Sequence, residues 1–374
     1  MKIKKILIFI SDEGFGHTVR QRSLIKSILK NIKYCEVEVI TSKKILLLKE
    51  TFKNKIKYHH KHNLIETIKK KDGSIDKIKT KKMFHHWLKS KKKWITDMCK
   101  KYPNPDLIIS DSVPQAFELA KKTNTKSINI SHFTWNWFYK KHCKNTKSKD
   151  KVLYELDKSY NLADNFLILP LTPAEIIKKY KKKHKKINFV ISDFDKVKKT
   201  KKKINCVIMD NGTKTLSVFI KKTIPYLKYI KNVNFFIGIK SYNQKIKKNI
   251  IDSKNIFPVN GLKKIHHTIS LADFVIARAG FNTITETLVL KKPAIFFNEV
   301  NNEETSFNIK MLRKLKIISI IKSNEWGENI IKRINKFLTF ELNSLTKKIK
   351  NKNFLSNGAN QVTDFILKDL RWQK

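Results

Sequence analysis

Cysteine is scarce in this sequence, with four residues in a chain of 374. Cys35, Cys99, Cys143 and Cys206 lie far apart and form no Cys-x-x-Cys pair. Such spacing argues against a disulfide framework and against a cysteine zinc site. It is typical of a protein from a reducing compartment, so we expect a cytoplasmic protein without a metal site.

Long apolar runs are missing as well. No run approaches the roughly 20 residues that a helix needs to cross a bilayer. The basic start of the chain is followed by a short apolar stretch, residues 6–10, and the acidic Asp12 and Glu13 come soon after it. This stretch is too short for a signal peptide, and we expect a buried strand there.

Acidic residues are few, because 31 Asp and Glu stand against 81 Lys and Arg, which gives a formal net charge of +50. Only six of the basic residues are arginine, which nucleic-acid sites favour for bidentate contacts. No recognisable nucleic-acid module accompanies the charge, so we expect no nucleic-acid partner. Abundant Lys, Ile and Asn indicate an A/T-rich coding bias. The alternative is a peripheral contact of dispersed lysines with anionic lipid on the inner face of the membrane.

What the sequence does contain is an alternation of apolar strands and amphipathic helices, which predicts an α/β protein. Its length has room for two domains of ordinary size. Residues 192–203 are charged and lack an apolar period, which is typical of a linker. We therefore predict a first domain at 1–191, a linker at 192–203, a second domain at 204–355 and a terminal helix at 356–374.

Within these domains the pattern predicts strands joined by helices. The expected strands are 6–11, 37–41, 56–58, 106–110, 127–130, 166–170 and 189–191, then 206–209, 233–237, 256–259, 274–277, 294–297 and 317–321. The expected helices are 18–30, 81–98, 115–122, 153–162, 215–227, 283–290 and the chain from about 329 onward. Parallel βαβ units of this kind bind ligands at the carboxyl ends of their strands.

The first turn of the chain carries Gly14, Gly16 and His17, followed by Arg20. His17 is expected at the N-terminus of the next helix, where a positive charge is disfavoured and neutral imidazole can accept a proton. We therefore predict a catalytic role for His17, with a solvent-facing loop histidine as the alternative. The histidines without such a glycine frame are expected to have no chemical role: His59, His60, His62, His85 and His86.

A second glycine turn organises residues 272–304. Arg278 and Gly280 follow an apolar strand, and Thr283 and Glu286 open the next helix. Free N–H groups at such a helix start would suit a phosphate. A purely structural interpretation is also open, because Thr283-x-x-Glu286 fits a capping box and Gly280 fits a tight turn.

Aromatic residues gather in two places. The segment 132–139 follows an expected strand, and we interpret it as a lid, a sugar-stacking platform that includes Trp135, or core. Trp87 and Trp94 lie seven residues apart on an expected helix, a spacing that is more typical of core than of a binding surface.

These motifs together resemble the GT-B glycosyltransferases, in particular the group that contains MurG. In the second domain the resemblance rests on Ala272, Asp273, Arg278, Gly280, Thr283, Glu286 and Pro293. Residues 14–20 resemble the N-terminal loop of several GT-B enzymes and of a UDP-sugar hydrolase that acts in pseudaminic acid synthesis. Residues 111–114, 132–139 and 302–304 resemble a glycosyltransferase-like domain that occurs alone in bacteria and fused to plant arabinokinases.

The resemblance implies two Rossmann-like doubly wound domains that face a central cleft, with the terminal helix crossing back to the first domain. It implies His17 as the general base, and Asp111 and Trp135 near the acceptor or the sugar. The donor-binding positions that it implies are Gly14, Gly16, Asn211, Gly212, Arg278, Gly280, Thr283, Glu286, Asn302 and Glu303.

We therefore expect a glycosyltransferase that moves a sugar from a nucleotide-sugar donor, with UDP as the expected nucleotide, to a hydroxyl of a glycan, a lipid or a small molecule. No metal or cofactor is expected, because helix dipoles and basic groups can stabilise the leaving diphosphate. One alternative is a UDP-sugar hydrolase that uses the same residues with water as the acceptor. Another is a non-catalytic protein that binds a nucleotide sugar or an anionic polymer.

Overall fold

A computed structural model of the protein describes residues 3–42, 44–143, 150–191, 203–209, 214–238, 250, 253–259, 262–370 and 372. The chain divides into two compact units, and each is treated by itself. Unit 1 comprises Met1–Ile68, Asp76–Ser192 and Leu355–Lys374, and unit 2 comprises Lys69–Ile75 and Asp193–Phe354. The predicted boundaries did not anticipate that residues 69–75 pack with the second half of the chain. Residues 192–202 of the predicted linker lie outside the described residues.

Unit 1 is built on a seven-stranded sheet in the order β3-β2-β1-β4-β5-β6-β7, in which every neighbouring pair is parallel. The order reverses between β1 and β4, and such a switch point opens a crevice at the carboxyl ends of the strands. The strands are β1 (Lys4–Ile10), β2 (Cys35–Thr41), β3 (Lys57–His60), β4 (Leu107–Asp111), β5 (Lys126–Ser131), β6 (Asn165–Ile168) and β7 (His184–Lys186).

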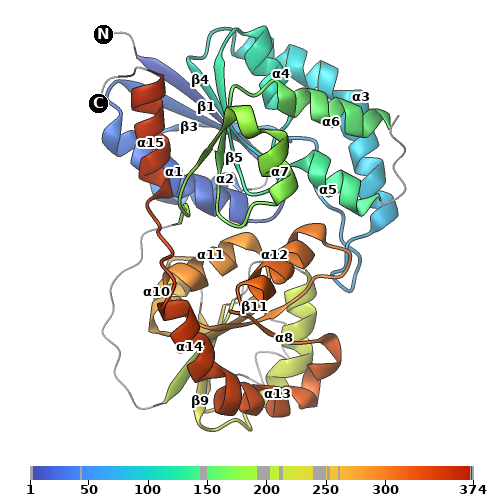
Figure 1. Cartoon of the computed structure of the whole chain (residues 1–374), viewed down its shortest axis with the longest axis vertical. Helices are drawn as coiled ribbons and strands as arrows, with labels where there is room; N and C mark the ends of the chain where they lie inside the picture. Colours follow the sequence, from blue (N-terminus) through green and yellow to red (C-terminus); the bar gives the residue numbers. More distant parts are fainter. Residues whose placement is uncertain are drawn as a thin grey trace. The chain divides into compact units, whose positions relative to one another are not determined.

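Helices cover both faces of this sheet (Figure 1). They are α1 (Gly16–Asn31), α2 (Ile45–Phe52), α3 (Lys77–Lys101), α4 (Gln115–Lys122), α5 (Trp135–His142), α6 (Lys151–Asn161), α7 (Ala174–Lys179) and α15 (Gly358–Asp369). α1 contacts both α2 and α15, whereas α3, α4 and α6 pack against one another on the other face. Because both faces are covered, residues 6–10 of β1 form a continuous apolar run and are fully buried.

The last strand of unit 1 differs from the prediction at 189–191. The edge strand is β7, which consists of polar residues, and Val190 forms only an isolated bridge with Asn357. Phe189 is buried and exchanges backbone hydrogen bonds with Leu355 and Gly358 next to α15. The apolar residues at 189–191 therefore pack next to the terminal helix and do not form a strand. The edge strand β7 pairs with one neighbour only, so its lysines can reach solvent.

Unit 2 is built on a six-stranded parallel sheet in the order β10-β9-β8-β11-β12-β13, with its switch point between β8 and β11. The strands are β8 (Ile204–Ile208), β9 (Val233–Gly238), β10 (Ile256–Val259), β11 (Phe274–Arg278), β12 (Ala294–Phe297) and β13 (Ser319–Ile320). The α-helices are α8 (Lys214–Leu227), α10 (Leu262–Leu271), α11 (Phe281–Val289), α12 (Glu303–Lys314), α13 (Ile330–Lys336) and α14 (Leu342–Lys350).

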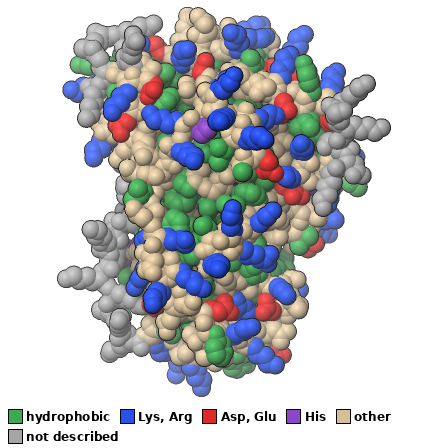
Figure 2. Space-filling view, viewed as in Figure 1, with side chains coloured by type: hydrophobic (Ala, Val, Ile, Leu, Met, Phe, Trp, Pro, Cys, Tyr) green, Lys and Arg blue, Asp and Glu red, His purple; other side chains and the backbone are tan. Residues whose placement is uncertain are grey.

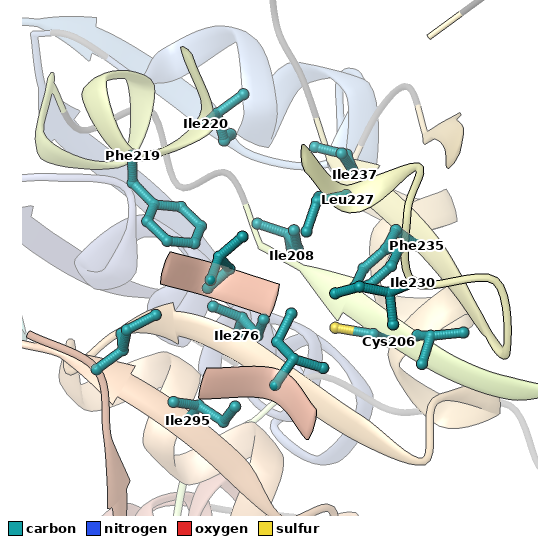
Figure 3. Close-up of a cluster of buried hydrophobic side chains, with 14 of the residues drawn as sticks. Cys206, Ile208, Phe219, Ile220, Leu227, Ile230, Phe235, Ile237, Ile276 and Ile295 are labelled. Carbon is teal, nitrogen blue, oxygen red and sulfur yellow. The ribbon is translucent and has the colours of Figure 1, made fainter. Parts of the chain in front are cut away.

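The core of unit 2 lies between α8 and the sheet. Phe219 and Ile220 of α8 pack in one buried cluster with Ile208, Ile276 and Ile295 of the central strands (Figure 3). α8 follows β8, so its N-terminus is at the carboxyl end of that strand, beside the switch point of the sheet. The two sheets together confirm the predicted α/β class with two Rossmann-like, doubly wound parts.

The visible face of the molecule carries basic charge in dispersed form (Figure 2). Figure 2 shows Lys and Arg side chains scattered over the visible face, with Asp and Glu interspersed among them. Within the described ranges, no helix is both long enough and apolar enough to cross a membrane.

Candidate functional site

The site in unit 1 is centred on His17 and Asp111, which come from the two strands at the switch point. His17 is the second residue of α1, which follows β1, and Asp111 is the last residue of β4. The Nδ1 atom of His17 lies 2.7 Å from Oδ1 of Asp111. Both side chains are buried, with Asp111 fully shielded and His17 at 6% exposure. The predicted catalytic histidine thus has a carboxylate partner that comes from a distant part of the sequence.

Two further side chains hold the Asp111 carboxylate in place. Arg20 donates from Nε to Oδ2 at 3.0 Å and from Nη2 to Oδ1 at 2.6 Å, a bidentate pair. Gln21 donates from Nε2 to Oδ2 at 2.9 Å. Burial alone would raise the pKa of Asp111, but the charge of Arg20 and the hydrogen bond from His17 outweigh it and hold that pKa well below its ordinary value. Asp111 is therefore a carboxylate over the working pH range.

This geometry determines which nitrogen of His17 can accept a proton. A carboxylate only accepts hydrogen bonds, so its partner Nδ1 carries a proton, and in the neutral imidazole Nε2 keeps its lone pair. Nη2 of Arg20 also approaches Nδ1 to 3.1 Å, but a protonated Nδ1 cannot accept from it. The arrangement is a carboxylate–imidazole pair whose outer nitrogen is suited to general-base chemistry.

The glycines of the first turn have different roles in the backbone. Gly14 has a φ of +56°, a conformation that favours glycine, whereas Gly16 is the first residue of α1. Phe15 forms the N-cap of that helix, and its ring lies under the Lys44 ammonium at 5.0 Å. The structure thus places Gly14 and Gly16 beside His17, and their donor-binding role stays a prediction.

The aromatic segment belongs to the core. Trp135 is fully buried, and its ring contacts Phe84, Phe133 and Phe138. Its indole N–H donates to the carbonyl of Ser112 at 2.8 Å. A sugar cannot stack on a ring that is fully buried, so the predicted sugar contact of Trp135 is wrong, and the core interpretation accounts for this residue. The apolar surface of the indole ring is covered by neighbouring aromatic side chains of the protein, so none of it is left for a ligand.

In unit 2 the predicted donor residues lie around the β11–α11 connection. Arg278 ends β11, Gly280 is the N-cap of α11, and Thr283 and Glu286 are buried on the helix at 5% and 4% exposure. α11 begins at Phe281, so Thr283 is inside the helix, and the capping-box interpretation is wrong. Gly280 lies in a tight turn, because its N–H donates to the Arg278 carbonyl at 2.7 Å, but its own backbone is extended and not left-handed.

The loop after β12 also uses its polar side chains locally. Asn302 is the N-cap of α12, because its side-chain oxygen accepts from the Thr305 N–H at 3.2 Å. Its amide nitrogen donates to Glu299 at 2.5 Å. Glu303 is the partly exposed first residue of α12, and Glu304 accepts from the Phe281 N–H at the start of α11 at 3.4 Å. Asn302 and Glu303 thus lie at the predicted edge of the sheet.

The sequence interpretation missed Glu299 and Gln21. Glu299 is fully buried, two residues beyond β12, and accepts a hydrogen bond from Nη1 of Arg278 at 3.0 Å. A polar residue just after the carboxyl end of an apolar strand was the available signal. Gln21 gave no signal, because its partner Asp111 is 90 positions away.

Two further predictions concern the residues Asn211 and Gly212 and the metal content of the protein. Asn211 and Gly212 are outside the described residues. In the portions of the chain that the structure describes, no group of three or more His, Cys, Asp or Glu side chains could hold a metal ion.

Comparison with known proteins gives a partial family match and many similar folds. The profile of the glycosyltransferase family 28 C-terminal domain matches residues 210–362. A search of curated proteins found no significant match.

Several solved structures are similar over almost the whole chain. The calicheamicin glycosyltransferase CalG4 has a TM-score of 0.69 at 10% identity and covers 99% of each chain. UGT2 of Phytolacca americana, complexed with UDP-2fluoro-glucose and pterostilbene, has a TM-score of 0.66 at 12% identity and covers 98% of this chain and 99% of that one. MurG of Acinetobacter baumannii has a TM-score of 0.61 at 15% identity, with coverages of 98% and 99%. At such identities the likeness establishes a shared fold.

Proposed function

We propose that this chain, which has the GT-B fold and matches the glycosyltransferase family 28 C-terminal domain over residues 210–362, is a glycosyltransferase that transfers a sugar from a UDP-linked donor to an acceptor hydroxyl. The observation that carries the proposal is the buried His17–Asp111 pair at the switch point of unit 1. Nε2 of His17 takes the proton of the acceptor hydroxyl as its oxygen attacks the anomeric carbon. The bond from that carbon to the diphosphate breaks, and UDP leaves. Asp111 stabilises the imidazolium that forms.

Unit 2 supplies the donor site in this proposal. Arg278 and the N-terminus of α11 lie at the carboxyl edge of the sheet, where a diphosphate would meet a guanidinium and the positive end of the helix dipole. Glu286 is buried on the same helix, in the position that holds ribose hydroxyls in the family pattern. These groups would stabilise the leaving diphosphate without a metal ion. The UDP specificity is supported by a structural neighbour that was solved with UDP-2fluoro-glucose.

Nucleotide binding gives the direct test. We expect UDP to raise the unfolding temperature of the purified protein, with GDP and CMP having little effect. At about 100 times its Kd a ligand adds about 2.7 kcal/mol to the unfolding free energy, which corresponds to several degrees. The Glu286→Ala variant should lose most of this shift, because it lacks the carboxylate for the ribose hydroxyls. Calorimetry would give the corresponding change in Kd.

Glu328→Ala is the matched control, because Glu328 is an exposed glutamate of the same unit. It should respond to UDP as the wild type does. If UDP, GDP, CMP and their sugars all leave the unfolding temperature of the wild type unchanged, the donor-site proposal is contradicted. Binding to an anionic polymer would then be tested by its dependence on salt concentration.

Hydrolysis is the second candidate, because residues 14–20 resemble the loop of a UDP-sugar hydrolase and the His17–Asp111 pair could activate water equally well. The two reactions differ in whether turnover requires an added acceptor. A transferase should release UDP slowly from its donor until an acceptor is added, whereas a hydrolase should release free sugar at its full rate in buffer alone.

A further inference from the structure

Residues 69–75 form a tight hairpin that belongs to unit 2 although they lie in the first half of the sequence. Lys69 and Ile75 pair in an antiparallel bridge, and the Lys70 N–H donates to the Ser74 carbonyl at 2.9 Å. The Asp72 carboxylate accepts from the backbone and the hydroxyl of Ser74 at 2.9 and 2.7 Å. These bonds fix the turn internally, so the hairpin presents a defined surface to its neighbours.

The hairpin is fastened to unit 2 on both sides. The Ile75 N–H donates to the Val300 carbonyl at 3.1 Å, and the Thr215 hydroxyl donates to the Gly73 carbonyl at 3.0 Å. Gly73 has a φ of +88°, and a Cβ at this position would lie 2.3 Å from the backbone nitrogen of Thr215. Ile75 is fully buried. The sequence therefore has glycine where the hairpin touches the start of α8.

The contact lies at the switch point of the second sheet. Thr215 is the second residue of α8, which follows β8, and Arg278 ends β11, the strand next to β8. Glu299 follows β12 by two residues. The hairpin therefore meets the start of α8 and the connection after β12, at the edge where doubly wound sheets hold their ligands.

A buried carboxylate links Lys69 to this edge. Oε2 of Glu299 accepts from Nζ of Lys69 at 2.8 Å and from Nη1 of Arg278 at 3.0 Å. The other oxygen lies 3.1 Å from the Thr215 hydroxyl, whose one proton is shared between this carboxylate and the Gly73 carbonyl. Burial would raise the pKa of Glu299, but Arg278 and Lys69 outweigh it and lower that pKa, so Glu299 remains charged. Glu299 thus brings two cations together at one point.

The charged ends of Lys69 and Arg278 belong to partly exposed side chains, although their partner Glu299 is buried. The side chain of Glu299 is fully shielded, whereas those of Lys69 and Arg278 are 18% and 14% exposed. An ammonium has three N–H donors, and the bond to Glu299 uses one of those of Lys69. A second anion at this edge can therefore bond to Lys69 without displacing Glu299.

We propose that Lys69 of the 69–75 hairpin belongs to the donor site, where it binds the diphosphate of the nucleotide sugar and Glu299 positions it beside Arg278. This inference rests on the proposed function. It adds a donor-binding residue from residues 69–75, a stretch in which the motif pattern placed none. Glu299 is a positioning residue, because it acts through the two cations.

Calorimetry with UDP and with uridine tests the proposal on the full-length protein. Lys69→Met should weaken UDP binding about tenfold, since a hydrogen bond to a charged group is lost. Uridine has no phosphate, so its Kd should be unchanged in the same variant. Lys69→Arg should restore UDP binding, because a guanidinium can also donate to a phosphate. Lys71→Met, which removes an exposed charge from the same hairpin, should bind UDP within about twofold of wild type.

Each other outcome overturns the proposal in a different way. An equal loss of UDP and uridine binding in Lys69→Met would mean that the hairpin only supports the fold. Unchanged or tighter UDP binding would mean that Lys69 does not contact the diphosphate. A wild type that binds neither compound would overturn the proposed function, and this inference with it.

Discussion

At the scale of the single residue, Asp111 connects the polar side chains of the unit 1 site. Its two oxygens accept hydrogen bonds from His17, Arg20 and Gln21, all of which belong to α1. Arginine is rare in this lysine-rich chain, and Arg20 uses the planar fork that lysine lacks. Substitutions at this site therefore have different consequences for catalysis and for stability, depending on which partner is removed.

Replacing His17 by alanine should affect chemistry alone. The Arg20–Asp111 pair remains, so folding and UDP binding should be close to those of the wild type. The rate of UDP release from the donor sugar should fall by about 10²–10⁴-fold, the usual contribution of a general base. Steady-state kinetics with the UDP-sugar that stabilises the protein would measure this. His85→Ala, at an exposed position, is the control, and turnover by His17→Ala at the wild-type rate would contradict the assignment of the base.

Asp111→Asn serves as the contrasting variant. It should slow turnover and also destabilise the fold by about 3–5 kcal/mol, because Arg20 loses its buried counter-charge. The pKa of Asp111 is lowered in the folded protein, so its contribution to stability is complete above the ordinary value of about 3.9 and is lost as the pH falls below it. Wild-type acid unfolding in that window should be steeper than that of the variant.

At the scale of the element, three helices of unit 1 meet at one lysine. Nζ of Lys91 in α3 donates to Glu118 of α4 and to Glu155 of α6, both at 2.6 Å. Lys91 itself is 7% exposed, and its ammonium lies 5.0 Å from the centre of the Trp87 ring. A buried lysine with two carboxylate partners ties these helices together on one face of the sheet.

We expect Lys91→Met to lower the unfolding free energy of the protein by about 2 kcal/mol, because two partly buried carboxylates lose their cation. Chemical unfolding followed by circular dichroism would measure the change. Lys92→Met removes an exposed charge from the same helix and should alter stability by no more than about 0.5 kcal/mol. Equal effects of the two substitutions would show that the Lys91 ion pairs add nothing.

At the scale of the whole molecule, the formal charge of +50 is the dominant property. Basic side chains are dispersed over the visible face, so like charges repel across the surface (Figure 2). Salt at about 1 M shortens the Debye length to about 3 Å and screens such repulsion. We therefore expect the unfolding temperature to rise by several degrees between low salt and 0.5–1 M sodium chloride, measured by differential scanning fluorimetry. A fall over this range would show that attractive ion pairs outweigh the repulsion.

Local pattern was enough to predict most of the elements. The strand expected at 294–297 and the helix at 115–122 have the predicted bounds, because an unbroken apolar run and a regular amphipathic period are complete signals in themselves. Trp87 and Trp94 are core residues, as their spacing on one helix face predicts. The alternation of strands and helices likewise determined the α/β class, since each βαβ unit contains its own crossover helix.

Tertiary structure decided how these elements combine. His17 was predicted from its glycine frame, but its pairing with Asp111 joins residues 94 positions apart, and only the register of β1 with β4 brings them together. The place of the 69–75 hairpin in unit 2 likewise depends on contacts with Thr215 and Glu299, which no periodicity encodes. The chain by itself specified local geometry and burial, because these follow from neighbours in sequence. The polar sites needed the fold, because a buried charge is stable only where a distant partner meets it.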